Sequence, residues 1–135
     1  MSSTSSVPPG STALVVDDDE FAAETMALTL SSLGVAEVHR AEDGQKALKL
    51  LATLQREPDF LVCDVFMPNM DGVEFLDKLS ARGYGGGVLI VTGVDPAMLS
   101  FTRTLAKGGS LRVLGTFVKP VARDELERAL ILPRE

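Results

Sequence analysis

Short apolar segments alternate with segments of helical periodicity along most of the chain. The apolar segments are rich in Val, Leu and Ile and are short enough to be strands. Most are nearly continuous in apolar residues, which is typical of parallel strands covered on both faces. The five predicted strands cover Ala13–Val16, Glu37–Arg40, Phe60–Asp64, Val88–Val91 and Leu111–Val118.

A segment with helical spacing follows each predicted strand. In the first, Ala23 and Leu30 share a face, and Gly34 suits the C-terminal cap. Asp95 and Pro96 indicate the start of the fourth, because Asp caps helix N-termini and Pro is tolerated at the first helical position. The predicted helices are Phe21–Leu33, a segment after Asp43-Gly44 with Ala47, Leu51 and Leu54 inward, Gly72–Ala81, Asp95–Lys107 and Ala122–Leu132.

Strand followed by helix, five times over, predicts an α/β fold with a doubly wound five-stranded parallel sheet. Right-handed crossovers would cover both faces, and ligands of such sheets bind at the carboxyl ends of the strands. The 135 residues fit one domain. We expect it to span residues 13–132, after a disordered Ser/Thr/Pro-rich leader over residues 1–12 and before a tail at residues 133–135.

Composition narrows the functional classes. The formal charge of −6 argues against nucleic-acid binding, which needs clustered Lys and Arg. Cys63 is the only cysteine, so an internal disulfide is excluded. The sequence shows no apolar run long enough to span a membrane, and the leader lacks the basic start and apolar centre of a signal peptide. We therefore expect a cytoplasmic protein.

Polar side chains stand at the carboxyl ends of four of the five predicted strands. The first strand ends at Asp17 and Asp18, the third at Asp64, the fourth at Thr92 and the fifth at Lys119. Each has a plainer interpretation alone: the acids as strand-end or helix-start residues, Thr92 as a turn residue and Lys119 as an exposed lysine. Their combination at one edge of the sheet favours a site.

The charges of these residues indicate the chemistry. Three carboxylates and one ammonium carry a net charge of −2, and crowded carboxylates repel one another unless a cation joins them. Hard oxygen ligands point to Mg²⁺, which pairs with phosphate oxygens. Asp64 is then a candidate nucleophile toward a phosphoryl group, with Lys119 and Thr92 contacting its oxygens. The negative charge gained on transfer is what a switch would sense.

The chain carries four motifs at these strand ends: Leu14–Asp19, Asp64 with Met67–Gly72, Val91–Gly93 and Val118–Pro120. Together they resemble the receiver (CheY-like) domain of two-component response regulators. The resemblance covers Ala13 to about Leu132 and implies a flavodoxin-like (βα)5 fold with strand order 2-1-3-4-5.

The resemblance assigns a role to each matching position. Asp64 is implied as the phosphoacceptor, Asp18 as a direct Mg²⁺ ligand and Asp17 as a ligand acting through water. Phe66 would offer its backbone carbonyl to the metal.

Further implications concern the switch and its partners. Thr92 and Lys119 are implied as the conformational responders, and the Lys119–Pro120 bond is usually cis in the family. The phosphodonor would be a histidine kinase or a histidine phosphotransfer protein. The domain would assist its own phosphorylation and dephosphorylation without being a conventional enzyme.

One position departs from the family pattern. An aromatic residue often stands three positions before the lysine, and here that position is Thr116. Phe117 follows, but strand alternation turns it to the other face of the sheet. We expect output to run through backbone shifts of Gly93–Lys107 instead.

Phe66 and Val94 also flank the predicted site and are apolar enough to hinder attacking water. They predict a long-lived phosphoryl group, whose loss a Phe66→Asn substitution should accelerate. An unchanged decay rate would remove this hypothesis.

The segment Gly108–Gly115 more weakly resembles receivers that precede EAL-type cyclic-di-GMP phosphodiesterase domains, so an output domain of that type, missing from this chain, is one option. Many relatives dimerise through the fourth helix, fifth strand and fifth helix, which leaves a homodimer open.

The sequence fits other functions less well than it fits a switch. A phosphatase or mutase with an aspartyl nucleophile typically needs a second acid two residues later, where this chain has Phe66. A receiver-like scaffold that binds partners without phosphorylation stays open because of Thr116, although the acids and Lys119 argue against it. Nucleotide binding is disfavoured, since no Gly-x-Gly-x-x-Gly follows the first strand.

Overall fold

A five-stranded parallel sheet forms the centre of the molecule. The computed structural model describes residues 7–64, 72–92 and 111–131, and within them the strands pair in the order β2-β1-β3-β4-β5. This confirms the predicted α/β fold and its strand order. The strands are β1 (Thr12–Val16), β2 (Glu37–Ala41), β3 (Phe60–Asp64), β4 (Gly87–Thr92) and β5 (Arg112–Val118).

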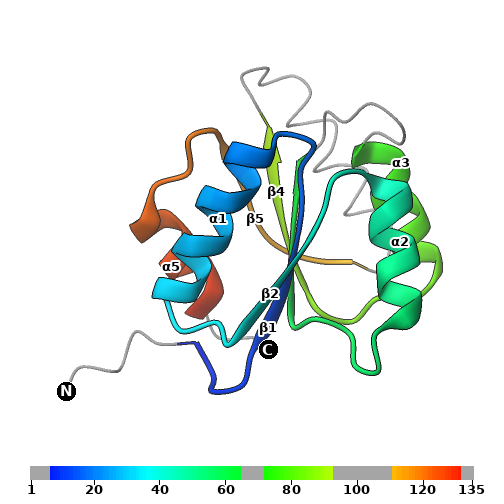
Figure 1. Ribbon diagram of the computed structural model, residues 1–135, viewed down its shortest axis with the longest axis horizontal. Coiled ribbons are helices and arrows are strands. Elements are labelled where there is room, and N and C mark those ends of the chain that lie inside the picture. Colours follow the sequence, from blue (N-terminus) through cyan, green and yellow to red (C-terminus); the bar gives the residue numbers. More distant parts are fainter. Residues whose placement is uncertain (1–6, 65–71, 93–110, 132–135) are drawn as a thin grey trace.

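Helices cover both faces of the sheet (Figure 1). α1 (Glu20–Ser32) and α5 (Arg123–Ile131) lie on one face, and α2 (Gly44–Thr53) and α3 (Gly72–Ala81) lie on the other. The expected helix over Asp95–Lys107 falls outside the described residues. Among the described helices, none has the length and apolar character that a membrane span requires.

Strand alternation divides the apolar side chains between two cores. In β1, Leu14 and Val16 face α2 and α3, whereas Ala13 and Val15 face α1 and α5. Burial on both faces explains why the central strands are almost wholly apolar. We name the two clusters the α2/α3-side core, which includes Leu14, Val16, Leu51, Leu61, Phe75 and Ile90, and the α1/α5-side core, which includes Val15, Leu30, Phe60, Val62, Val91 and Leu126.

Local capping fixes where α1 begins and ends. The Asp19 side chain accepts hydrogen bonds from the N–H groups of Phe21 and Ala22, at 3.0 and 3.3 Å, and so satisfies donors that the first turn leaves open. Gly34 follows the helix with φ of 109°, a conformation that glycine adopts without strain. Because Asp19 is used as the cap, Asp17 and Asp18 are left at the carboxyl edge of the sheet.

Residues 7–12, which belong to the expected leader, pack against the rest of the domain in this structure. Val7 is buried in the α1/α5-side core, and Ser11 donates from its N–H and its hydroxyl to the Pro8 carbonyl. The N–H of Thr12 donates to the Asp59 carboxylate at 2.9 Å. One apolar side chain and a turn therefore anchor a stretch whose composition alone suggested disorder. The predicted tail at residues 133–135 lies outside the described residues.

The end of β5 agrees with the predicted alternation. Thr116 pairs with Ile90 of the α2/α3-side core, and Phe117 pairs with Val91 and packs against the α1/α5-side core. The Lys119–Pro120 peptide bond is cis, as the resemblance implied. An irregularity in the β4–β5 register between Val88 and Leu89 was not predicted.

Candidate functional site

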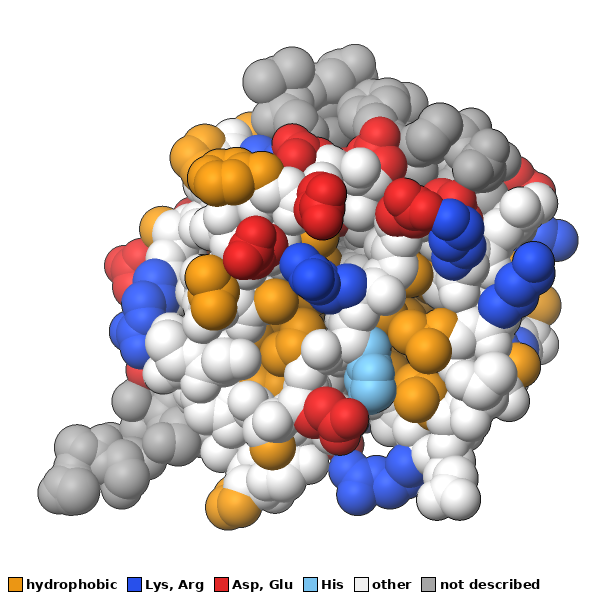
Figure 2. Space-filling view, in the orientation of Figure 1, with side chains coloured by type: hydrophobic (Ala, Val, Ile, Leu, Met, Phe, Trp, Pro, Cys, Tyr) orange, Lys and Arg blue, Asp and Glu red, His pale blue; other side chains and the backbone are white. Residues whose placement is uncertain are grey.

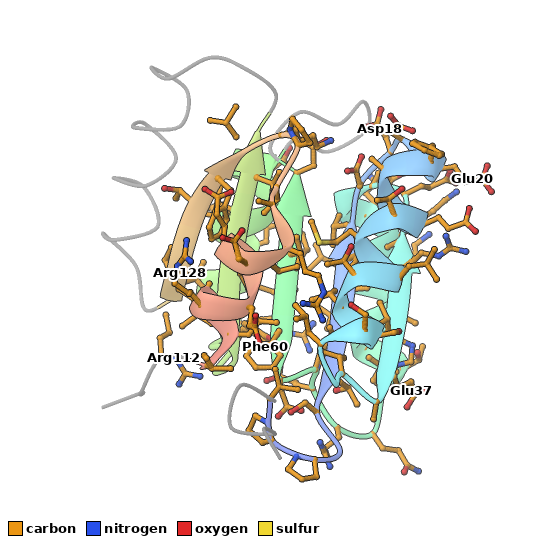
Figure 3. The ribbon with its side chains drawn as sticks, turned by 90° about the vertical axis from the view of Figure 1, so that its left-hand side faces the viewer. Asp18, Glu20, Glu37, Phe60, Arg112 and Arg128 are labelled. Atoms are coloured by element: carbon orange, nitrogen blue, oxygen red, sulfur yellow. The ribbon has the colours of Figure 1, made fainter. Side chains whose placement is uncertain are left out.

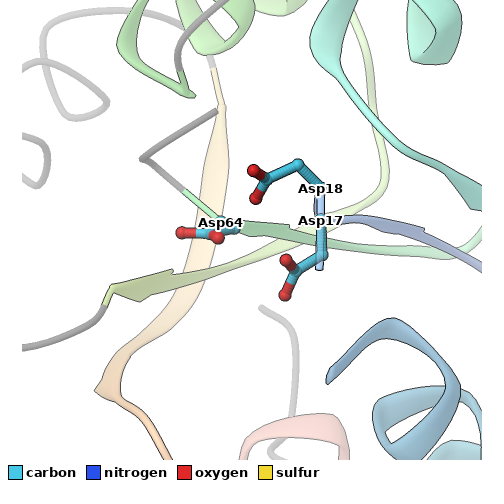
Figure 4. A group of neighbouring side chains, drawn as sticks. All are labelled: Asp17, Asp18 and Asp64. Atoms are coloured by element: carbon cyan, nitrogen blue, oxygen red, sulfur yellow. The ribbon is translucent and has the colours of Figure 1, made fainter. Parts of the chain in front are cut away.

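The carboxyl ends of β1 and β3 bring three aspartates together. β1 and β3 are neighbours, and the pairing of Val16 with Cys63 places Asp17 and Asp64 next to each other. Asp18 follows Asp17 out of the strand, and its carboxylate gathers with the other two (Figure 4). One carboxylate oxygen from each aspartate lies within 4.8 Å of the others.

Burial makes this cluster electrostatically costly. Asp17 and Asp64 are only 8% and 6% exposed, whereas Asp18 is exposed to solvent. Hydrogen bonds hold both the backbone and the side chain of Asp17. Its N–H donates to the Ala41 carbonyl, and its Oδ1 accepts the N–H of Asp19. Like charges in such a place need a compensating cation.

Lys119 supplies one cation from the end of β5. Its Nζ donates to Asp17 Oδ2 at 2.9 Å and to Asp64 Oδ2 at 3.1 Å. Burial lowers the pKa of Lys119, but the hydrogen bond to Asp17 and the charge of Asp64 outweigh it, so the pKa lies above its ordinary value. The ammonium therefore stays charged at neutral pH and links two strands that are distant in sequence.

The charge balance leaves room for a further cation. Three carboxylates against one ammonium leave a net charge of −2 at the cluster. Asp19 and Glu20 follow Asp18 directly in the chain and are exposed, and acidic side chains are frequent along the upper rim in Figure 2. The donors are carboxylate oxygens at close spacing, which are the ligands that Mg²⁺ prefers. The residues present therefore fit a magnesium ion.

The structure places some predicted site residues and leaves others undescribed. Asp17, Asp18, Asp64 and Lys119 are brought together. Thr92 ends β4, opposite Val118, but its side chain is not among those the structure describes. Phe66 lies outside the described residues, so its predicted backbone contact to a metal stays a prediction.

An apolar groove beside the aspartates was not foreseen from the sequence. It has a volume of about 210 Å³, opens between α1 and α5, and reaches Asp17, Asp64 and Lys119. The sequence feature that could have indicated this groove is Phe21, a large apolar residue directly after an acidic run. In the structure Phe21 lines the groove and is 76% exposed. Other residues along the groove include Thr25, Met26, Pro120, Val121 and Leu126.

Comparison with known proteins assigns the family. The model of the response regulator receiver domain matches residues 13–131, most of the chain. The chain therefore belongs to the response regulator receiver domain family. It is also similar to the response regulator MprA of Mycolicibacterium vanbaalenii, with 40% identity over 82 residues that cover 61% of this chain and 34% of that protein.

Solved structures show the same fold. The chemotaxis protein CheY4 of Vibrio cholerae is 27% identical, with a TM-score of 0.73 over 89% of this chain and 95% of that chain. A chain of the CheX–CheY–BeF3–Mg²⁺ complex from Borrelia burgdorferi is 20% identical, with a TM-score of 0.76 over 90% and 87% of the two chains. At that identity the second likeness supports the fold alone.

Family membership sets the general function. The protein is a receiver domain of a two-component response regulator, a signalling domain rather than a conventional enzyme. Receiver domains bind Mg²⁺ at an acidic pocket and interact with histidine kinases or phosphotransfer proteins. The chain spans about a third of the length of the curated relatives it matches.

Proposed function

We propose that Asp64 is the phosphoacceptor of this receiver and that Asp17, Asp18 and Asp64 hold the Mg²⁺ on which its phosphorylation depends. The observation that carries the proposal is Lys119 Nζ, which bridges Asp17 and Asp64 inside a cluster of three carboxylates. A structural ion pair alone would need one carboxylate for one ammonium, whereas this cluster carries two negative charges in excess.

Phosphoryl transfer to Asp64 requires no proton removal from the acceptor, because the attacking carboxylate is already ionised. A carboxylate oxygen of Asp64 attacks phosphorus, an O–P bond forms, and the N–P bond of a phosphohistidine donor breaks. The imidazole nitrogen keeps the electron pair of that bond and binds a proton. Because Asp64 lies at a strand end in a short, well-packed sheet, its carboxylate is held in place for this attack.

Positive charge around the transferred group lowers the barrier. Lys119 already contacts Asp64 and is placed to follow the oxygens of an incoming phosphoryl group. A bound divalent ion supplies further charge to those oxygens. The predicted Thr92 hydroxyl would donate a hydrogen bond there, and the predicted Phe66 carbonyl would complete the metal ligands.

The experiment is phosphorylation by acetyl phosphate in the presence and absence of Mg²⁺, followed by the mass of the intact protein. We expect one phosphoryl adduct with Mg²⁺ and none after chelation or in Asp64→Asn. Asp59→Asn is the matched control, since this acid lies at the opposite end of β3 and should leave the adduct intact. Complete absence of an adduct in the parent protein would contradict the proposal and favour a phosphorylation-independent scaffold.

The wider assembly rests on the sequence resemblance. We infer a cytoplasmic receiver over residues 13–132 that takes its phosphoryl group from a histidine kinase or phosphotransfer protein. The separate, weaker resemblance of Gly108–Gly115 leaves an EAL-type output domain as one option beside a stand-alone receiver, and the receiver resemblance leaves a homodimer open. Light scattering before and after phosphorylation tests the dimer, and a constant monomer mass in both states would remove it.

A further inference from the structure

The groove between α1 and α5 joins the surface of the molecule to the phosphoacceptor. Phe21 stands at its mouth in the first turn of α1, and Asp64 and Lys119 lie at its inner end. Figure 3 shows α1 and α5 side by side over this face of the sheet. A change at Asp64 therefore takes place next to side chains that reach the surface.

The end of β5 directs its aromatic side chain to this same face. Phe117 pairs with Val91, which lines the groove, and Phe117 packs against the α1/α5-side core. Thr116 pairs with Ile90 and faces the opposite side of the sheet. The aromatic side chain of β5, Phe117, therefore lies on the α1/α5 side of the sheet, two residues before Lys119.

Gly115 allows Phe117 to lie close against the strand. A β-carbon at position 115 would stand 2.7 Å from Cζ of the Phe117 ring, nearer than a real contact permits. The ring therefore lies over the glycine, in contact with backbone on one side and with the core on the other. Its position depends on the path of the β5 backbone.

Lys119 sits between two residues that pack on the same core. Phe117 is two residues before it, and Val121 is two residues after it and lines the groove. The Lys119 ammonium is tied to Asp17 and Asp64. Lys119 therefore lies in a short segment whose apolar side chains, two residues before it and two residues after it, both pack on the α1/α5-side core.

We propose that phosphorylation of Asp64 is transmitted to the α1/α5 face, through Phe117 and the segment Lys119–Val121, and not through the side chain at position 116. This inference rests on the proposed function of Asp64. When Asp64 becomes an acyl phosphate, the Lys119 ammonium turns from the carboxylate to the new phosphoryl oxygens. Phe117 and Val121 then repack against α1 and α5, and the groove beside Phe21 changes shape, because close-packed cores shift between discrete arrangements.

A single tryptophan reports on the groove. The chain has no tryptophan, so Phe21→Trp gives one fluorophore at the mouth. Leu48→Trp is the matched reporter on the other face, since Leu48 packs against the α2/α3-side core. Each protein is treated with Mg²⁺ and acetyl phosphate, and emission is recorded together with the intact mass of the same sample. We expect the emission of Phe21→Trp to shift on phosphorylation and that of Leu48→Trp to change much less.

Second substitutions in the Phe21→Trp protein test the route. Phe117→Ala should abolish the emission shift while the phosphoryl adduct still forms, and Phe117→Leu should reduce it. Thr116→Ala is the control at the neighbouring position and should keep both the shift and the adduct. Thermal unfolding of each variant identifies any that fail to fold. If Phe117→Ala fails to fold, the size of the emission shift in Phe117→Leu decides whether the route runs through Phe117.

The outcomes separate this inference from the proposed function. An adduct without an emission shift at position 21, or a shift that survives Phe117→Ala, would overturn the route and leave Asp64 as the phosphoacceptor. Loss of the shift in Thr116→Ala would overturn the route as well. Absence of any adduct in the parent protein would overturn both.

Discussion

Polar side chains lie at both ends of the sheet, but their hydrogen-bond partners differ. At the amino end, the Tyr84 hydroxyl donates to the Pro58 carbonyl at 2.7 Å, and Asp59 accepts the N–H of Thr12. At the carboxyl end, Asp17 and Asp64 share the Lys119 ammonium. Figure 3 shows the separation, with Asp18 and Glu20 at one end and Phe60, Glu37 and Arg112 at the other.

This difference distinguishes structural from functional polar groups. At the amino end each of these side chains meets a backbone partner and crosslinks neighbouring segments of the chain. At the carboxyl end, like charges are concentrated beyond what the fold requires, which is costly unless a ligand joins them. The balance of charge therefore separates the two ends.

The largest expected effect follows from removing the ammonium. Lys119→Met leaves Asp17 and Asp64 facing each other, and it removes charge that assists phosphoryl transfer. We expect phosphorylation by acetyl phosphate to slow by about 100-fold, the loss typical of one electrostatic donor. Stability without Mg²⁺ should fall by about 1 kcal/mol, a value below that of a fully buried pair because Lys119 is partly exposed.

The response to Mg²⁺ provides a second test of the Lys119→Met variant. A divalent ion replaces the missing positive charge, so it should raise the unfolding temperature of Lys119→Met more than that of the parent. An equal response of both proteins to Mg²⁺ would show that the ion does not bind among these carboxylates.

A smaller effect is expected for the exposed member of the cluster. Asp18→Asn removes one charge and one hard ligand from the site. Its Mg²⁺ affinity, measured by calorimetry, should fall by at least about tenfold, since even indirect partners of a metal ligand cause losses of that size. Without Mg²⁺ the variant should be at least as stable as the parent, because like charges are fewer. Unchanged affinity would exclude Asp18 as a ligand.

At the amino end, Tyr84→Phe should change stability and leave phosphorylation alone. The substitution leaves the buried Pro58 carbonyl without its partner, which costs about 1–2 kcal/mol in chemical denaturation. Phosphorylation at full Mg²⁺ should match the parent. Loss of phosphorylation in a folded Tyr84→Phe protein would contradict the division between the two ends.

Alkaline pH provides an independent test of the same residue. Burial raises the pKa of the Tyr84 phenol, with the charges of Glu57 and Asp59 adding to the effect. The stability that the neutral phenol contributes is complete below about pH 10, the ordinary value for tyrosine, and is lost as pH rises above it. The parent should therefore lose stability more steeply than Tyr84→Phe above that pH, while Lys119 titrates in both proteins and cancels in the comparison.

The smallest effect is expected at the surface. Lys46 and Glu42 form an exposed ion pair near the carboxyl end. Glu42→Gln should leave the unfolding midpoint unchanged within error, because such pairs contribute little. Phosphorylation should also be unchanged, so this variant serves as a control for mutations that alter net charge near the site.

The fold and the convergence of the candidate site were predictable because parallel strands end at a common edge. Asp17, Asp64 and Lys119 are far apart in sequence, yet strand ends alone place them together. The hydrogen bond from Lys119 Nζ to Asp17 was not predicted, since it depends on how far the lysine side chain extends. The roles of Thr92 and Phe66 stay predictions, because they rest on the resemblance.

Other features of the structure could not be predicted from the sequence pattern, because they depend on tertiary packing. Val7 lies in a segment without periodicity, so its packing depends on tertiary contacts alone. The register irregularity opposite Val88 and Leu89 has no separate sequence signal. The groove beside Phe21 arises from how α1 and α5 pack, which a one-dimensional pattern does not contain.

The most direct test of the central claim is to locate the phosphoryl group itself. Protein phosphorylated with acetyl phosphate and Mg²⁺ is treated with borohydride, which reduces an aspartyl phosphate to homoserine, and its peptides are then sequenced by mass spectrometry. We predict homoserine at position 64 only. Homoserine at position 17 or 18, with Asp64 unmodified, would contradict the assignment of the site.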